Sequence, residues 1–247
     1  MRALICTATL ALTTLVTAVP ASAQLVHSLQ LGAGLFMPRG LDSRTQGDVL
    51  VRNYFGEAIP SLPNFSDALA FDVKDFRGGR LFGEWNIAFG DHVEVGAGLG
   101  FYRKTVPTVY LDLVDPRGLE VEQQLKLQIV PVTGVVRFLP FGRPGDVQPY
   151  VGAGVSLLNY RYSESGDFID TNTLDIFSNR YTTSGSTLGG LLLGGVRFPI
   201  GGDVYGMAVE GRYQFGAGKT GGIDKGFLAE KIDLSGGELN FSFLVRF

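Results

Sequence analysis

The chain has 247 residues, of which 45% are hydrophobic and 18% are charged, and its formal net charge at pH 7 is −3. A weakly acidic chain lacks the basic surface that nucleic-acid binding requires, and no segment after the N-terminus has the run of about 18 apolar residues typical of a transmembrane helix. The one cysteine is Cys6, so neither a disulfide framework nor thiol chemistry is expected in the rest of the chain.

The first 23 residues have the pattern of a cleavable export signal. Arg2 provides a positive start, residues 4–19 are largely apolar, and Ala-Ser-Ala at residues 21–23 is the small-x-small motif that signal peptidase cleaves. An N-terminal membrane anchor is the less favoured interpretation, because the apolar core is short for a span of about 20 residues. We therefore expect residues 1–23 to be a signal peptide and residues 24–247 to form one mature domain.

Apolar and polar residues alternate with a period of two through the rest of the chain, as in strands with one outward and one inward face. The fourth strand changes phase near Val130 and Pro131, and because proline cannot donate to a strand ladder we expect a bulge or an edge-like irregularity there. In all, the alternation predicts eight strands, at residues 26–37, 79–90, 92–106, 119–139, 147–163, 183–199, 203–216 and 229–247.

The connections between the predicted strands alternate in length. Outer-membrane barrels have short periplasmic turns and longer external loops, and an even number of strands brings both termini to one side. We therefore expect both termini in the periplasm and the longer links outside the cell. The short turns lie at residues 90–92, 140–146 and 200–203, and the longer links at 38–78, 107–118, 164–182 and 217–228.

The end of the chain carries apolar side chains at alternate positions, namely Leu239, Phe241, Phe243, Val245 and Phe247. A terminal phenylalanine preceded by alternating aromatics resembles the C-terminal signal of outer-membrane barrels, which implies recognition by the barrel-assembly machinery. Residues 149–155 and 211–215 also resemble the small OmpA/opacity-type barrel family, and the likeness extends over residues 24–247. The resemblance implies an all-β protein of the Gram-negative outer membrane, an eight-stranded antiparallel up-and-down barrel surrounded by lipid.

Glycine repeats lie on the first, third and fifth predicted strands, as Gly-Ala-Gly at residues 32–34, 96–98 and 152–154. The alternation puts both glycines of each repeat inward. Because an eight-stranded barrel has room only for its own side chains, these glycines would leave space for long side chains from neighbouring strands. A phosphate-binding glycine loop is not expected, since such a loop leads into a helix.

The predicted inward charges have mixed signs. Charges held away from water must be paired, so we expect an ion-pair network that fills the lumen. A polar path for small solutes, or a gate of exchanging pairs, is the alternative, less favoured because eight strands leave a narrow bore. The residues are Arg80, Glu84, Glu94, Lys126, Arg137, Arg197, Glu210, Arg212, Glu238 and Arg246.

The chain has two histidines, His27 and His92, which both fall at the predicted periplasmic end. Lipid-modifying barrel enzymes use a histidine with Ser or Asp near the outer leaflet, and neither histidine fits that arrangement. We therefore expect no enzymatic activity and no catalytic residues. Two separated histidines without cysteine do not favour a metal site built from nitrogen or sulfur ligands, and no cofactor is expected.

The first long link carries the apolar residues Tyr54, Phe55, Ile59, Leu62 and Phe65. These side chains cap the barrel mouth or form a surface for a ligand or partner, and capping is favoured because an ordered loop must bury some surface. A short helical turn is expected at residues 67–71.

Three functions follow in order of preference. The first is a non-enzymatic barrel with a filled lumen that contributes to envelope integrity, or to adhesion through loops that meet a host or envelope ligand. The second is a narrow channel or transporter for small or hydrophobic solutes. The third is a lipid-modifying enzyme, and no nucleic-acid partner is expected.

Overall fold

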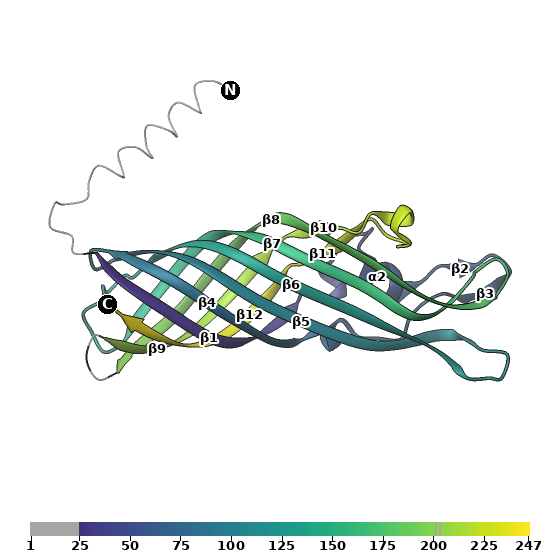
Figure 1. Cartoon of the computed structure of the whole chain (residues 1–247), viewed down its shortest axis with the longest axis horizontal. Coiled ribbons are helices and arrows are strands. Elements are labelled where there is room, and N and C mark those ends of the chain that lie inside the picture. The colour runs from purple at the N-terminus through teal and green to yellow at the C-terminus, as the bar shows by residue number, and fades with distance from the viewer. Residues whose placement is uncertain (1–24, 201, 203) are drawn as a thin grey trace, which may run out of the picture.

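The computed structural model describes residues 25–200, 202 and 204–247, and its main feature is a closed antiparallel barrel of eight strands (Figure 1). Around the ring the strands follow the order β1, β12, β9, β8, β7, β6, β5, β4. The predicted eight-stranded up-and-down barrel is therefore confirmed, whereas the expected signal peptide lies outside the described residues. The strands are β1 (Val26–Pro38), β4 (Gly78–Phe89), β5 (Val93–Val114), β6 (Glu120–Phe138), β7 (Gln148–Ile169), β8 (Ile176–Ile200), β9 (Tyr205–Phe215) and β12 (Gly236–Arg246).

Two links carry small elements of their own. The link after β1 contains η1 (Leu41–Ser43), α2 (Val49–Phe55), β2 (Ala58–Ile59), β3 (Leu62–Ser66) and η2 (Val73–Phe76), and the link after β9 contains β10 (Ala217–Lys219), η3 (Gly222–Lys225) and β11 (Lys231–Asp233). In the described part of the chain, none of the helices has the length and apolar character that crossing a membrane requires.

The helix of the first link starts where a side chain caps it. The Asp48 carboxylate accepts hydrogen bonds from the backbone N–H groups of Leu50 and Val51, which would otherwise lack partners at a helix start. The predicted helical turn at residues 67–71 is wrong, since that segment is not helical. The last predicted strand was also too long, because residues 229–235 belong to the β11 region and β12 begins at Gly236.

The barrel has two parts that differ in their surroundings. In the terminal half, β1 begins, β12 ends and the short turns connect the strands. In the loop half, β5, β6, β7 and β8 run well beyond the other four strands (Figure 1). The links at residues 39–77, between β1 and β4, and 216–235, between β9 and β12, also lie in this half. The links predicted at 107–118 and 164–182 are therefore mostly strand, and the actual hairpin ends are only residues 115–119 and 170–175.

An apolar belt surrounds the terminal half. Its outward side chains are large, hydrophobic and exposed, with Leu188 77% and Leu99 58% exposed, while their inward neighbours are polar. A belt of this kind is what the hydrocarbon core of a bilayer requires of a barrel. The C-terminal set takes part in the belt, because Leu239, Phe241 and Phe243 point outward from β12. Its recognition by assembly machinery remains a prediction.

The polarity of the two faces reverses in the loop half. On β6, Leu125, Leu127 and Ile129 point inward and are at most 2% exposed, whereas the alternating positions that point outward are polar. The strand does not slip, because Val130 pairs with Asn159 and Pro131 with Leu158 in one continuous register. The predicted bulge is therefore wrong, because the apolar residues change face where the strand leaves the belt. The predicted irregularity is present, since Val130 and Pro131 have no pairing partner on β5 although the register is the same on both sides.

The inward glycines make room for neighbouring side chains, as the repeats predicted. A Cβ atom added at Gly98 would lie 2.9 Å from Thr133 Oγ1 and 3.1 Å from Glu84 Cγ. The outward-facing Gly134 of β6 is different, since the nearest atom to its added Cβ is Val155 Cγ2 at 3.9 Å. The small residue at Gly98 is therefore required by the packing of the lumen.

We expect Gly98→Val to destabilise the folded barrel by about 1–3 kcal/mol, because the added side chain overlaps Glu84 and Thr133. The measurement is urea unfolding in lipid vesicles, followed by the fluorescence of Trp85, the one tryptophan of the chain. Gly134→Val is the matched control and should lose little stability. Equal losses in both variants would contradict the prediction.

Candidate functional site

The lumen of the terminal half is filled by four arginines and four glutamates. Each is at most 5% exposed, and their charges cancel. They come from six of the eight ring strands, so the layer crosses the whole bore. The residues are Arg80, Arg137, Arg197, Arg212, Glu84, Glu94, Glu210 and Glu238.

Two arginines and two glutamates form the centre of this layer. Arg137 Nη2 lies 2.5 Å from Glu84 Oε1 and 3.1 Å from Glu210 Oε2. Arg212 also contacts both carboxylates, with Nη2 2.9 Å from Glu84 Oε2 and Nε against Glu210 Oε1. The Tyr150 hydroxyl donates to Glu210 Oε2 at 3.0 Å. We name these four charged residues, Glu84, Arg137, Glu210 and Arg212, the central quartet.

The remaining pairs lie on either side of the central quartet. Arg197 donates two hydrogen bonds to Glu94, at 2.7 and 3.0 Å, and Arg80 pairs with Glu238. Arg246, near the end of β12, donates to Gln148 Oε1 at 2.6 Å. The structure thus places nine of the ten predicted residues inside the barrel.

Lys126 is the exception to the predicted network. It lies on the outer surface of the loop half, because its strand keeps one register and the inward positions of β6 are odd-numbered. Its assignment to the lumen assumed that the apolar residues of β6 face outward on both sides of Pro131, with a bulge between them, and β6 has no such bulge.

Aromatic rings connect the charged pairs. Tyr150 lies between Arg137 and Arg197, with its ring centre 5.4 Å from each guanidinium carbon. Phe82 has Arg80 and Arg212 at 5.8 and 5.4 Å. Guanidinium groups over aromatic faces gain cation–π attraction while remaining paired. The ion pairs and aromatic contacts therefore form one connected layer, in which few side-chain rotamers are available to the arginines.

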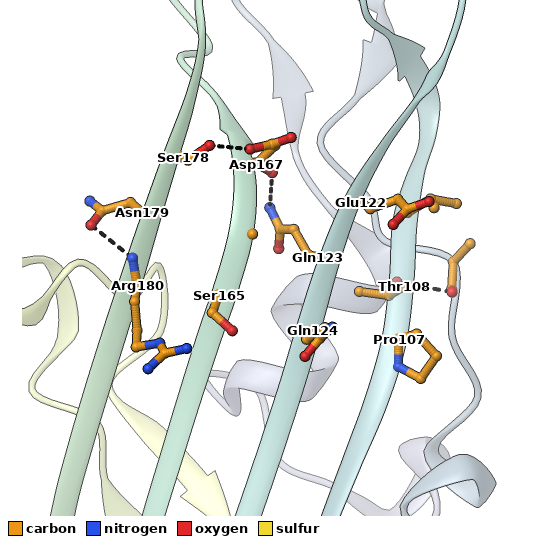
Figure 2. A pocket seen from close by; sticks show the side chains of 13 residues that line it. Pro107, Thr108, Glu122, Gln123, Gln124, Ser165, Asp167, Ser178, Asn179 and Arg180 are labelled. Carbon is orange, nitrogen blue, oxygen red and sulfur yellow. Dashed lines mark hydrogen bonds between the residues drawn. The ribbon is translucent and has the colours of Figure 1, made fainter.

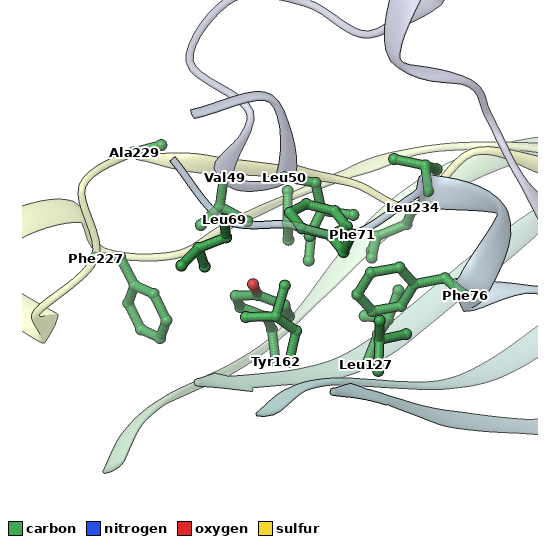
Figure 3. Packing of buried hydrophobic residues seen from close by; sticks show 14 of the residues in the cluster. Val49, Leu50, Leu69, Phe71, Phe76, Leu127, Tyr162, Phe227, Ala229 and Leu234 are labelled. Atoms are coloured by element: carbon green, nitrogen blue, oxygen red, sulfur yellow. The ribbon is translucent and has the colours of Figure 1, made fainter. Parts of the chain in front are cut away.

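The loop half is closed by a hydrophobic core, shown in Figure 3. Apolar residues of the first link, including Val49, Leu50 and Phe76, face inward residues of the ring such as Leu127, and the last link contributes Phe227 (Figure 3). We name the two links, residues 39–77 and 216–235, the cap. Two segments far apart in sequence therefore close the barrel mouth together.

The predicted external residues divide between this core and the surface. Ile59 is 1% exposed and Leu62 packs against the core, so neither belongs to an external surface. Tyr54, Phe55 and Phe65 are exposed, with Phe55 at 64%. Capping therefore holds for Ile59 and Leu62, and a ligand or partner surface at Tyr54, Phe55 and Phe65 stays a prediction.

Almost no space separates the charged layer from the hydrophobic core. A hollow of about 10 Å³ lies between them, lined by residues that include Arg80, Tyr102 and Glu238. This volume is about what one water molecule needs. The Tyr102 hydroxyl, which donates to the backbone carbonyl of Phe76, fixes the cap directly above this point.

A buried carboxyl group lies beneath the cap. Glu164 Oε1 accepts hydrogen bonds from Asn53 Nδ2 at 2.6 Å and from the Tyr162 hydroxyl at 2.9 Å, and no ion pair joins it among the described residues. It lies seven residues beyond Leu157, the last belt residue of β7. Burial raises the pKa of Glu164 above its ordinary value, and the two hydrogen bonds only partly oppose this.

An open hollow of about 850 Å³ lies further out, where β5 to β8 meet the first link (Figure 2). Its side chains are mostly amides and hydroxyls, and several are held in place: Gln123 donates to the backbone carbonyl of Asp167 at 3.1 Å, and Thr108 to that of Ala70 at 2.9 Å. Such a lining offers hydrogen bonds, and it also carries the charged side chains of Glu122, Asp167 and Arg180.

Both histidines lie at the terminal end of the barrel. The ring of His27 stacks on Trp85 at 5.6 Å and on Phe247 at 6.1 Å, and His92 Nδ1 is 2.9 Å from the Leu139 carbonyl oxygen. Within the described residues no group of three or more histidine, cysteine or acidic side chains is placed to hold a metal ion.

No protein-family model and no curated protein sequence matches the chain. Among solved structures, it is similar to the outer membrane protein OprG of Pseudomonas aeruginosa, at 12% identity and a TM-score of 0.49 over 91% of this chain and 97% of that one. It is also similar to the Neisserial surface protein NspA, at 12% identity and a TM-score of 0.44 over 91% and 99%. The expected likeness to small outer-membrane barrels is confirmed at the level of fold, and it rests on the closed ring and its apolar belt.

We expect Arg137→Met to destabilise the barrel by about 3–5 kcal/mol, because Glu84 and Glu210 then share a single arginine in a buried site. Urea unfolding followed by Trp85 fluorescence measures the loss. Adding Glu84→Gln alone restores the neutrality of the central quartet and leaves Glu210 paired with Arg212, so it should recover part of the loss. Arg117→Met, in the exposed hairpin after β5, is the control and should change stability by less than about 0.5 kcal/mol. Equal losses at Arg117 and Arg137 would refute a special role of the layer.

A second prediction concerns pH. A carboxyl whose folded pKa is raised costs no stability below its ordinary value of 4.5, and stability is lost as the pH rises through the folded pKa. The cap should therefore open more readily at pH 8 than at pH 5, measured as hydrogen exchange of the amides of α2 after correction for intrinsic rates. Glu164→Gln should remove this dependence, whereas Glu230→Gln, in the exposed part of the cap, should not. A pH dependence unchanged by Glu164→Gln would rule out this carboxyl as its source.

Proposed function

We propose that this protein is a non-enzymatic barrel of the outer membrane with a closed lumen, which contributes to envelope integrity and presents its cap as a surface for adhesion. The observation that carries the proposal is the double closure of the bore. A neutral layer of buried ion pairs fills the terminal half, and a hydrophobic core fills the loop half.

The two layers oppose conduction in different ways. An ion crossing the terminal half would have to separate pairs of the central quartet, and breaking a buried pair costs about 3–5 kcal/mol. A polar solute crossing the loop half would have to displace apolar side chains such as Leu50 and Leu127, which are fully or almost fully buried. A solute would therefore have to open both layers to cross the barrel.

The orientation follows from the length of the connections. Short turns lie at the terminal half and the long links at the loop half, and in outer-membrane barrels the long loops face outward. This arrangement supports periplasmic termini and a cap outside the cell. Because β5 to β8 extend past the shorter strands (Figure 1), the cap packs against their inward side chains.

The absence of enzymatic activity is part of the proposal. A lipid-modifying barrel needs its histidine near the outer leaflet, whereas His27 and His92 lie at the opposite end, next to the belt aromatics and the first turn. The surface of the cap is better suited to binding other molecules than to catalysis. It exposes apolar side chains, including Ile223 at 84% and Phe55 at 64%, on a folded support.

The test is single-channel recording of the refolded protein in planar bilayers at neutral and low pH. We expect no reproducible conductance steps from protein that shows a heat-modifiable folded band on a gel, and a porin in the same membranes serves as the positive control. Reproducible steps that change when Glu210 or Arg212 is neutralised would overturn the closed lumen and favour a channel gated by these ion pairs.

A further inference from the structure

Four positive side chains gather on the outer face of the loop half. Arg103 of β5, Lys126 of β6, Arg161 of β7 and Arg180 of β8 all point outward. Together with polar neighbours they line a hollow of about 490 Å³ on that face. We name these four residues the basic patch.

The pairing of the strands brings these residues together. Arg103 pairs with Gln128, which pairs with Arg161 on the other side. Lys126 occupies the next outward row, opposite Thr105 and Ser163. In the row after that, Arg180 lies opposite Ser165. The four cations therefore occupy three consecutive outward rows, separated only by uncharged amide and hydroxyl side chains.

The basic patch has no acidic partner among the described residues. None of its four members forms a salt bridge, in contrast to the fully paired arginines of the lumen. Partial desolvation and the positive charges of Arg103, Arg161 and Arg180 lower the pKa of Lys126. Cations that repel one another in a shared hollow are stabilised by an anion that enters it.

The basic patch begins where the apolar belt ends. On β5, Phe101 is the last outward residue of the apolar belt and Arg103 is the next outward position. On β7, Arg161 lies four residues beyond Leu157, which at about 3.3 Å per residue and a tilt of about 40° is roughly 10 Å above the belt. The polar headgroup region of a bilayer extends about 5–8 Å beyond the hydrocarbon. Arg103, two residues beyond Phe101, lies about 5 Å above the belt and so within the headgroup region, and the other three cations lie further out.

This placement limits the anion that would fit. A simple phospholipid would reach Arg103 but not Arg180, which is eight residues beyond Leu188 of β8. A glycolipid whose phosphorylated sugars extend outward from the membrane would reach all three rows. Arginine and lysine bind phosphate oxygens, and the amides and hydroxyls between them suit sugar hydroxyl groups.

We propose that the basic patch binds the phosphate groups of a phosphorylated glycolipid in the outer leaflet. The proposal rests on the proposed function in one respect, since it requires the loop half to lie outside the cell. It also supplies a mechanism for the proposed role in envelope integrity, because each barrel would bind neighbouring glycolipid molecules through ionic contacts. Acidic side chains of this face, Glu122 and Asp167, lie one row further out, so the row nearest the belt stays positive.

The experiment measures binding of purified phosphorylated lipid A, the glycolipid probe, to the folded full-length barrel in detergent by native mass spectrometry. The test variant is Arg103→Gln/Lys126→Gln/Arg161→Gln/Arg180→Gln. Since a basic residue near an anionic membrane surface contributes about 1 kcal/mol, we expect binding to weaken at least about 10-fold. The control, Arg117→Gln/Lys219→Gln/Lys225→Gln/Lys231→Gln, removes the same charge from exposed positions elsewhere and should bind as the wild type does.

The wild type should also lose at least about 10-fold in affinity for the same glycolipid after its phosphates are removed. Equal loss in the test and control variants, or equal binding of the dephosphorylated glycolipid, would overturn the proposal. So would a soluble sulfated polysaccharide or inorganic phosphate that displaces the glycolipid at equal concentration, since the site would then favour a free anion. If the fourfold variant fails to give a heat-modifiable band, Arg161→Gln/Arg180→Gln and the dephosphorylated probe carry the same test.

The outcomes separate this proposal from the closed lumen. Conductance in planar bilayers reports on the central quartet and the cap, which lie inside the barrel, whereas glycolipid binding reports on its outer face. A conducting barrel that binds phosphorylated glycolipid would overturn only the proposed closure. A silent barrel that does not discriminate phosphorylated from dephosphorylated glycolipid would overturn only the binding site.

Discussion

The structure depends on the neutrality of a narrow interior. Eight strands enclose a space that side chains can fill, and a charge placed there without a partner would cost several kcal/mol. Four arginines and four glutamates satisfy this constraint by cancelling and by sharing partners across the bore. The inward glycines are part of the same solution, since positions such as Gly98 leave the volume that Glu84 occupies.

A second constraint acts along the strands and explains the division into two halves. Within the belt, apolar side chains face outward and polar ones inward; beyond it, the same strands have an apolar interior and a polar exterior. The reversal needs no change of register, as the pairing of Pro131 with Leu158 shows. It also creates the two features that lie beyond the belt, a cap with its own hydrophobic core and an outer sheet surface that carries unpaired positive charge.

Alternation alone was enough to predict the eight strands and the inward position of most charged residues, because a period of two assigns each side chain to a face. It failed at Lys126, where apolar residues were taken to face outward along the whole of β6. It also ended β5 and β7 too early, since polar outward positions looked like loops. The partner of each arginine depends on contacts across the bore between distant strands, and the packing of the cap depends on segments such as those of Leu50 and Phe227, so neither can be read from local pattern.

The carboxylate of Asp48 connects an early and a late segment of the chain. It caps α2 in the first link, accepts from Arg44 at 3.0 Å, and also accepts at 2.5 Å from the backbone N–H of Asp233, 185 residues later. Contacts of such separation form late in folding, because the cost of closing the intervening loop comes before the gain. The cap therefore cannot be completed until the link before β12 lies beside the link after β1, so a finished cap marks a chain whose first and last links have already met.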